Sequence, residues 1–245
     1  MAIARWRKGD KNIEGLNKTY EDWTTDWWQW SHSMPNNGDP NDHPLRSDGS
    51  KAHIGQPIRP LGSYRPVWFC GGYWESNNSN TNRCFVLPED RSDCSILFAV
   101  IVSGIAEDEF QPPILPLDPS PVEKIDAAYS LITDPTTTAN ITIEGPDFTE
   151  RLHKYDLDLI IPNTVVRIWP SPGFEINGMK GPIDLGTAGY WCFLKGPLQR
   201  GNYHITLDGD APMFGHYIGE REKSRFRLFL TYDITVPSKP DQLFH

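Results

Sequence analysis

The 245-residue chain has no long apolar run. Its longest, Ser95–Val102, has the length of a buried strand, whereas a membrane-spanning helix needs roughly 20 apolar residues. Residues 1–18 are charged and lack the apolar stretch of a signal peptide. We therefore expect no membrane partner, and a protein that is either cytoplasmic as written or secreted with its signal peptide removed.

Basic residues are also scarce. The chain carries 23 Lys and Arg against 32 Asp and Glu, a net charge of −9. Nucleic-acid binding depends on basic side chains that neutralise phosphates, so this balance argues against a nucleic-acid partner. It argues equally against adsorption to an anionic membrane surface.

Cysteine and the common cofactor motifs are sparse or missing. The four cysteines include no C-x-x-C pair, so a zinc ribbon or a thioredoxin-like site has little support. Buried free thiols or one loop-closing disulfide are the simpler interpretations. There is no Gly-x-Ser-x-Gly elbow, no Gly-x-Gly-x-x-Gly and no Gly-Lys-Ser/Thr phosphate loop. We expect no cofactor, and the oligomeric state is left open.

What the chain has is tryptophan, concentrated near its start. Trp23, Trp27, Trp30 and Met34 follow the i, i+4, i+7, i+11 spacing of one helix face. Thr19 is placed to be the N-cap, with an acidic residue three positions later, as in a capping box. A helix with so much indole on one side predicts a large core on which it docks.

The rest of the pattern is mainly β. A second helix is indicated at 121–133, where Ser120 precedes a proline and Glu123 completes a capping box. Short apolar or alternating segments bounded by Gly and Pro predict the strands. These lie at 67–70, 84–87, 96–102, 141–143, 157–161, 164–169, 190–194, 203–207 and 226–236. We predict a jelly-roll-like β-sandwich at 19–236 with an N-terminal Trp-rich helix and one crossover helix, flanked by an arm at 1–18 and a tail at 237–245.

The order of several motifs resembles a family of uncharacterised, mostly secreted bacterial and archaeal proteins. The matching residues are Thr19-Tyr20, Trp23, Trp27-Trp28-Gln29-Trp30, Pro35, His43-Pro44, Asp48, Gln56, Pro66-Val67-Trp68-Phe69, Gly71-Gly72, Arg83-Cys84, Pro88, Gly201–Ile205, Gly209 and Leu230–Val236. The chain departs from the family in lacking its signal peptide, in having His53 where many members carry a cysteine, and in an insertion at 57–65. The resemblance bears on the fold and implies no activity.

Two groups of residues are candidates for catalysis. The loop that carries His43, Asp48 and His53 has the ligand types of an iron or zinc site, but its spacing fits no common motif, and Asp48 is explained as well by turn chemistry. We therefore predict no metal there. Glu107 follows the buried strand and is a candidate acid if its pKa is raised by burial, although a solvated acidic turn is the plainer interpretation.

A third group is a candidate ligand site. Trp68, Tyr73 and Trp74 flank a Gly-Gly pair, and aromatic side chains beside glycines can form a stacking platform for a ring. Gln56 lies at the end of the preceding polar loop, 35–65, which we expect to cover that platform. The alternative is that Trp68 is ordinary core.

Three classes of function follow. The first, which the aromatic pattern favours, is a protein that binds a carbohydrate or other ring-bearing small molecule. The second is a cofactor-free hydrolase, lyase or cyclase with acid–base residues in an aromatic pocket. The third is a structural or assembly protein, for which a jelly roll is a common shell.

Overall fold

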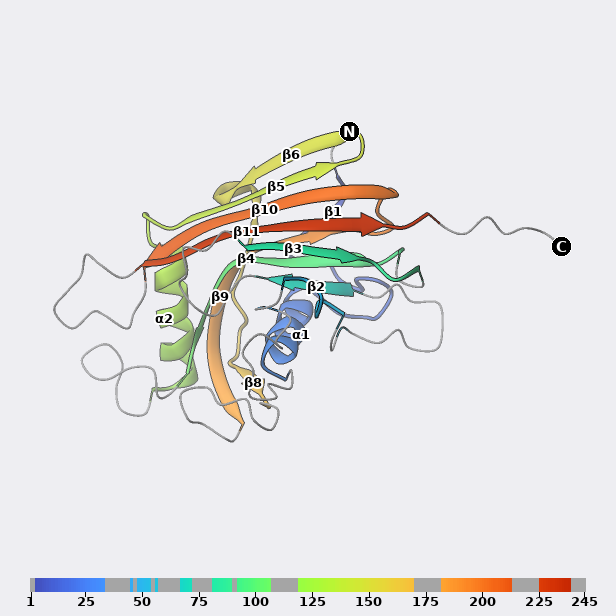
Figure 1. Cartoon of the computed structure of the whole chain (residues 1–245). Helices are drawn as coiled ribbons and strands as arrows, with labels where there is room; N and C mark the ends of the chain where they lie inside the picture. Colours follow the sequence, from blue (N-terminus) through green and yellow to red (C-terminus); the bar gives the residue numbers. More distant parts are fainter. Residues whose placement is uncertain are drawn as a thin grey trace.

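The computed structural model describes residues 3–33, 45, 48–53, 56, 67–71, 81–89, 92–106, 119–169, 182–212 and 225–238. Over these residues the chain is mainly β, with two α-helices and two mixed sheets (Figure 1). In chain order the elements are β1 (Arg5–Trp6), α1 (Tyr20–Ser33), β2 (Val67–Gly71), β3 (Thr81–Val86), β4 (Ser95–Ile105), α2 (Pro121–Thr133), β5 (Thr138–Gly145), β6 (Phe148–His153), η4 (Lys154–Asp156), β7 (Asp158–Ile160), β8 (Val166–Ile168), β9 (Ile183–Leu194), β10 (Gly201–Pro212) and β11 (Arg225–Val236). Neither helix has the length and apolarity needed to cross a membrane.

The two sheets form the sandwich that the strand pattern predicts. The first sheet has the order β1-β9-β4-β2, with β7 and β8 also paired to β9, and the second has the order β3-β11-β10-β5-β6. The β2–β4 and β3–β11 pairs are parallel, and the other pairs are antiparallel. Figure 1 shows the second sheet above the helices and β9 of the first sheet between α2 and α1. The jelly-roll winding stays a prediction.

Helix α1 covers one face of the first sheet, as its tryptophan pattern predicts. The Thr19 amide donates to Asp22 Oδ2 at 2.8 Å, and the Asp22 amide donates to Thr19 Oγ1 at 3.2 Å, so the capping box is present. Trp27 packs edge-on against Trp191 of β9, and its Nε1 donates to the Cys70 carbonyl at 2.9 Å. All four helix tryptophans are buried, which confirms that the helix closes part of the core.

The first sheet is therefore buried on both faces. Trp68 and Cys70 point to the second sheet, whereas Val67 and Phe69 point to α1, as the period of two predicts. Double-sided burial also explains why β4 is an unbroken apolar run rather than an alternating one.

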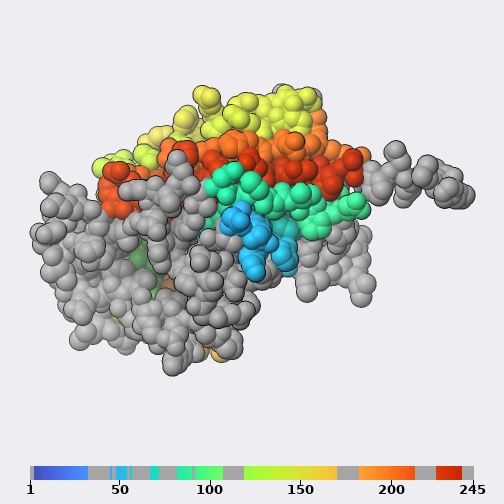
Figure 2. Space-filling view, in the orientation of Figure 1, coloured from blue at the N-terminus to red at the C-terminus, as the bar shows by residue number. Residues whose placement is uncertain are grey.

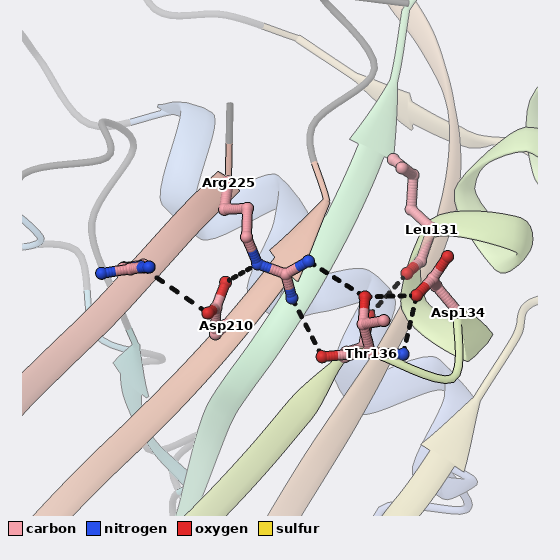
Figure 3. Close-up of polar contacts among 7 residues, drawn as sticks. Leu131, Asp134, Thr136, Asp210 and Arg225 are labelled. Carbon is pink, nitrogen blue, oxygen red and sulfur yellow. Dashed lines mark hydrogen bonds and ion pairs between the residues drawn. The ribbon is translucent and has the colours of Figure 1, made fainter. Parts of the chain in front are cut away.

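Helix α2 packs on β9 and β4 at the far end of the sandwich. Its capping box, Ser120 with Glu123, is present as predicted. The turn that follows it is tied to the second sheet, because Arg225 donates from Nη1 to Thr136 Oγ1 and from Nη2 to the Thr136 carbonyl, both at 2.9 Å (Figure 3). The same guanidinium donates from Nε to Asp210 at 2.7 Å.

The stretch 1–18, expected to be an arm, contributes to both sheet and core. Arg5 and Trp6 pair with Leu194 and Phe193 of β9, and Ile13 has no exposed surface. A two-residue strand is too short to show the alternation that identifies a strand in a sequence.

Candidate functional site

Of the three aromatic residues of the expected platform, Trp68 is not at the surface. The Trp68 side chain is 2% exposed and its ring is stacked on Phe85 of β3, with centroids 5.5 Å apart. Trp68 is thus a core residue between the two sheets, the alternative that the sequence left open. Tyr73 and Trp74 lie outside the described residues, as do the catalytic candidates His43 and Glu107.

Gln56 has a structural position. Its Nε2 donates to the carbonyls of Ala52 and Phe69, each at 2.9 Å, and its Oε1 accepts from the Phe69 amide at 2.7 Å. Because β2 is at the edge of the first sheet among the described strands, no described strand pairs with Phe69 on that side. The primary amide of Gln56 supplies both the donor and the acceptor that a neighbouring strand would offer.

Asp48 forms the turn that its sequence suggests. Its Oδ1 accepts from the Ser50 amide at 3.0 Å, and hydrogen bonds from Ser50 hold the pKa of the Asp48 carboxyl below its usual value. The Asp48 carbonyl accepts from the Cys84 amide at 2.9 Å, which fastens residues 48–53 to β3 (light blue and green in Figure 2). His53 is exposed in the same turn. The described residues contain no group of three His, Cys, Asp or Glu suited to a metal ion, and His43 lies outside them.

A buried polar centre lies where these segments meet. Arg83 of β3 is 1% exposed and donates from Nη1 to the Gly71 carbonyl at 2.6 Å and to the Tyr232 hydroxyl at 2.7 Å. It also donates from Nη2 to the Leu45 carbonyl. Burial raises the pKa of Tyr232 to about 12. The centre joins β2 of the first sheet to β3 and β11 of the second, so its evident role is to hold the sheets together.

The hollow beside this centre is small. A partly open hollow of about 10 Å³ lies here, which is roughly room for one water molecule. Its lining residues are Trp30, Leu45, Ala52, Phe69, Cys70, Arg83, Phe85 and Tyr232. A sugar ring does not fit in such a space. The buried centre therefore has a structural role and is not itself a ligand site.

The outer face of the second sheet, formed by its side chains that point away from the first sheet, has a different character. At its centre Asp233 of β11 accepts from Asn82 Nδ2 at 2.8 Å through Oδ2, and its Oδ1 lies 2.6 Å from Nδ1 of His204. These two hydrogen bonds are the main causes that lower the pKa of Asp233. The Cys84 thiol donates to Asp233 Oδ2 at 3.7 Å, and partial desolvation together with the Asp233 charge raises the pKa of this thiol. All four cysteines are free thiols, and Cys84 is the exposed one.

An exposed aromatic side chain lies on the same face. Phe229 is two residues from Thr231 and four from Asp233, so all three point outward from β11, and the Phe229 side chain is 44% exposed. Asp208 of β10 stands directly opposite Phe229. The strand rise places Phe229 about 13 Å from Asp233 along β11. The outer face thus combines one apolar ring with a held array of planar polar groups.

This arrangement suits hydrogen bonding better than proton transfer. The His204 and Asp233 side chains are 45% and 46% exposed, so water screens their charges. Acid–base catalysis usually depends on groups whose pKa values are shifted in a water-poor site. Fixed polar groups on an open sheet can still present a defined pattern of donors and acceptors to a ligand.

The sequence did not indicate this face as a site, although part of the signal was present. The alternation in 203–207 and 226–236 predicts that His204 and Asp233 point away from the core. It does not predict that they are neighbours, because that depends on the register His204–Asp233 between two strands.

In comparisons with known proteins, no family model matches the chain, and neither the curated proteins nor the solved structures give a significant match.

Proposed function

We propose that the protein binds carbohydrate on the outer face of the second sheet. The observation that carries the proposal is Phe229, an exposed ring on the same face as hydrogen-bonded Asn, Asp and His side chains. A sugar has an apolar face of C–H groups that stacks on an aromatic ring, and a rim of hydroxyls that pair with planar polar side chains. The proposal keeps the jelly-roll-like sandwich predicted from the sequence, an architecture that lectin domains share.

The polar groups on this face are oriented before any ligand arrives. Asp233 is fixed by Asn82 and His204, and Thr231 donates to Asn82 Oδ1 at 2.8 Å. Beneath them, the Arg83–Tyr232 centre fixes the strands that carry them. Such preorganisation favours binding because less side-chain freedom is lost when the ligand docks.

The test is calorimetric titration of the full chain with a panel of neutral oligosaccharides and soluble polysaccharides. Phe229→Ala should weaken binding of the responding sugar by about tenfold, which corresponds to about 1.4 kcal/mol and to the upper range for an aromatic contact. Tyr155→Ala is the matched control, because Tyr155 is 93% exposed in η4, the turn between the two sheets. The proposal is wrong if no member of the panel binds, or if Phe229→Ala and Tyr155→Ala behave alike.

A hydrolase or lyase is the second candidate, favoured by the Asp233–His204 pair. A carboxylate that holds Nδ1 of an imidazole leaves Nε2 to act as a general base. This candidate predicts shortened or unsaturated products after incubation with the bound sugar, lost in His204→Gln. If the sugar binds but is not changed, the hydrolase or lyase is ruled out and carbohydrate binding stands as the function.

A further inference from the structure

We infer that the ligand of the outer face is a neutral polysaccharide chain that runs across the strands, an inference that rests on the proposed function. The first observation is a row of side chains in register on all five strands of the second sheet. In order from β3 to β6 the row is Asn82, Thr231, Thr206, Thr142 and Arg151, each directly opposite the next. Four of the five carry a hydroxyl or amide.

A second row lies alongside the first. It consists of Cys84, Asp233, His204, Glu144 and Thr149, again directly opposite one another from β3 to β6. Two residues along a strand separate the rows, which is roughly 7 Å. A track of paired polar rows thus crosses the sheet perpendicular to its strands.

The length of this track selects the size of the ligand. Neighbouring strands are about 4.8 Å apart, so a row on five strands is about 19 Å long. A monosaccharide contacts side chains on adjacent strands only, whereas an oligosaccharide chain can contact the whole row. Each further strand that the chain reaches adds hydrogen-bond partners, so affinity should rise with chain length.

The balance of charges on the outer face favours a neutral polysaccharide. The outward charged side chains of these strands are four carboxylates, Glu144, Asp208, Asp210 and Asp233, and three guanidinium groups, Arg151, Arg225 and Arg227. Arg225 and Arg227 both pair with Asp210, at 2.7 and 3.6 Å. The near balance offers no excess of positive charge to an acidic polysaccharide, and the net charge of −9 on the whole chain repels one.

The test is a length series of the neutral oligosaccharide that responds best, from dimer to hexamer, titrated into the full chain at low and high salt. The hexamer should bind about tenfold more tightly than the dimer, because two or three added hydrogen bonds are worth about that factor. Salt should change the affinity little, because a neutral chain makes no ion pairs. An acidic polysaccharide of similar length should bind more weakly than the neutral one.

A pair of variants locates the track. Thr142→Val removes a hydroxyl from the β5 position of the first row, and it should weaken hexamer binding about fivefold while leaving the dimer unaffected. Thr133→Val is the control, because Thr133 is on α2 and its hydroxyl donates to the Tyr129 carbonyl of its own helix. Equal affinity for dimer and hexamer, a preference for the acidic chain, or an unaffected Thr142→Val would overturn this inference and leave carbohydrate binding standing. Absence of binding to every sugar would overturn both.

Discussion

Tyr232 and Asp233 are adjacent in β11 but act on opposite faces of the second sheet. The Tyr232 hydroxyl accepts from Arg83 and donates to the Gly71 carbonyl at 2.6 Å, inside the sandwich. Asp233 orients His204 and Asn82 on the outside. Because successive side chains of a strand point to opposite faces, β11 contributes both to the buried polar centre and to the candidate binding surface.

The buried phenol predicts how stability changes at high pH. Below pH 10 a tyrosine is neutral in both the folded and the unfolded chain. Between pH 10 and about 12 the unfolded chain loses this proton first, because burial raises the folded pKa of Tyr232 to about 12, so the unfolding free energy falls as pH rises. In Tyr232→Phe that fall should be smaller, by up to about 3 kcal/mol. Urea unfolding at several pH values measures it.

Tyr155→Phe is the control for this pH dependence, since Tyr155 is almost fully exposed. Its profile should match that of the parent chain. If Tyr232→Phe and the parent lose stability equally between pH 10 and 12, the phenol of Tyr232 ionises in the folded protein as easily as in the unfolded one.

Truncation of the Trp27 side chain should cause a large loss of stability. The side chain is 3% exposed, packs on Trp191 and donates to the Cys70 carbonyl. Trp27→Ala should lower the unfolding free energy by about 3–5 kcal/mol, the usual result of emptying a buried aromatic site. Trp169→Ala, at a side chain that is 61% exposed, should cost far less. Overlaid denaturation curves for Trp27→Ala and the parent would show a peripheral helix.

The sequence predicted the buried face of α1 but not the role of each aromatic residue. Trp23, Trp27 and Trp30 follow a helical period, and a period identifies a face that must be covered. Trp68 shows no such signal, because a strand buried on both sides makes every aromatic position equivalent in the sequence. Which residues are exposed depends on the second sheet, and its pairing is set by contacts between distant segments.

At the scale of elements, the ends of α2 are the best defined. Ser120 Oγ accepts from the Glu123 amide at 3.3 Å, and Glu123 accepts from the Ser120 amide at 2.8 Å. Beyond the other end, Asp134 Oδ1 accepts from the Thr136 amide and stabilises the turn. Arg225 donates to the Thr136 carbonyl of the same turn (Figure 3). The helix is therefore secured at its start by its own residues and beyond its end by β11.

The start of α2 gives a prediction with an internal control. Ser120→Ala removes the N-cap and should lower the unfolding free energy by about 1 kcal/mol. Ser130→Ala removes an exposed hydroxyl from the same helix, one that bonds only to the Asp126 carbonyl of its preceding turn, and should change stability by less. Thermal unfolding of the two variants side by side decides it. Equal melting temperatures would mean that the cap contributes nothing.

Elements with local signals were predicted and those without were not. Both helices carry capping boxes, and β4 and β11 have clear apolar or alternating patterns. β6 was not predicted, because its sequence, FTERLH, is largely polar. It forms a strand because it pairs with β5. The outer face escaped prediction for the same reason, since it exists only once five strands are in register.

At the scale of the molecule, the first sheet is the shared wall of two cores. One core lies between the sheets, and the other lies between the first sheet and α1. Strands β2, β4 and β9 contribute side chains to both. The two cores should therefore unfold together, because both depend on the same strands of the first sheet.

A two-probe unfolding experiment tests this coupling. Thiol labelling of Cys192 reports on the core between the sheets, and fluorescence of the α1 tryptophans reports on the other core. Both transitions should have the same midpoint in urea, as expected for one cooperative domain. A lower midpoint for the tryptophans would show that α1 detaches first and that the chain has two stability units.

The position of β11 has a consequence for how the chain is made. Among the described strands β3 pairs only with β11 in the second sheet, and its Asn82 bonds to Asp233, 151 positions later. A ribosome therefore releases β3 long before its partner exists, and contacts between such distant segments form slowly. Until residues 225–236 have emerged, the second sheet lacks β11, the strand that joins β3 to β10 and β5, so their inner faces cannot pack as one layer on the first sheet. Nascent chains of this protein should consequently depend on holding chaperones until β11 has left the ribosome.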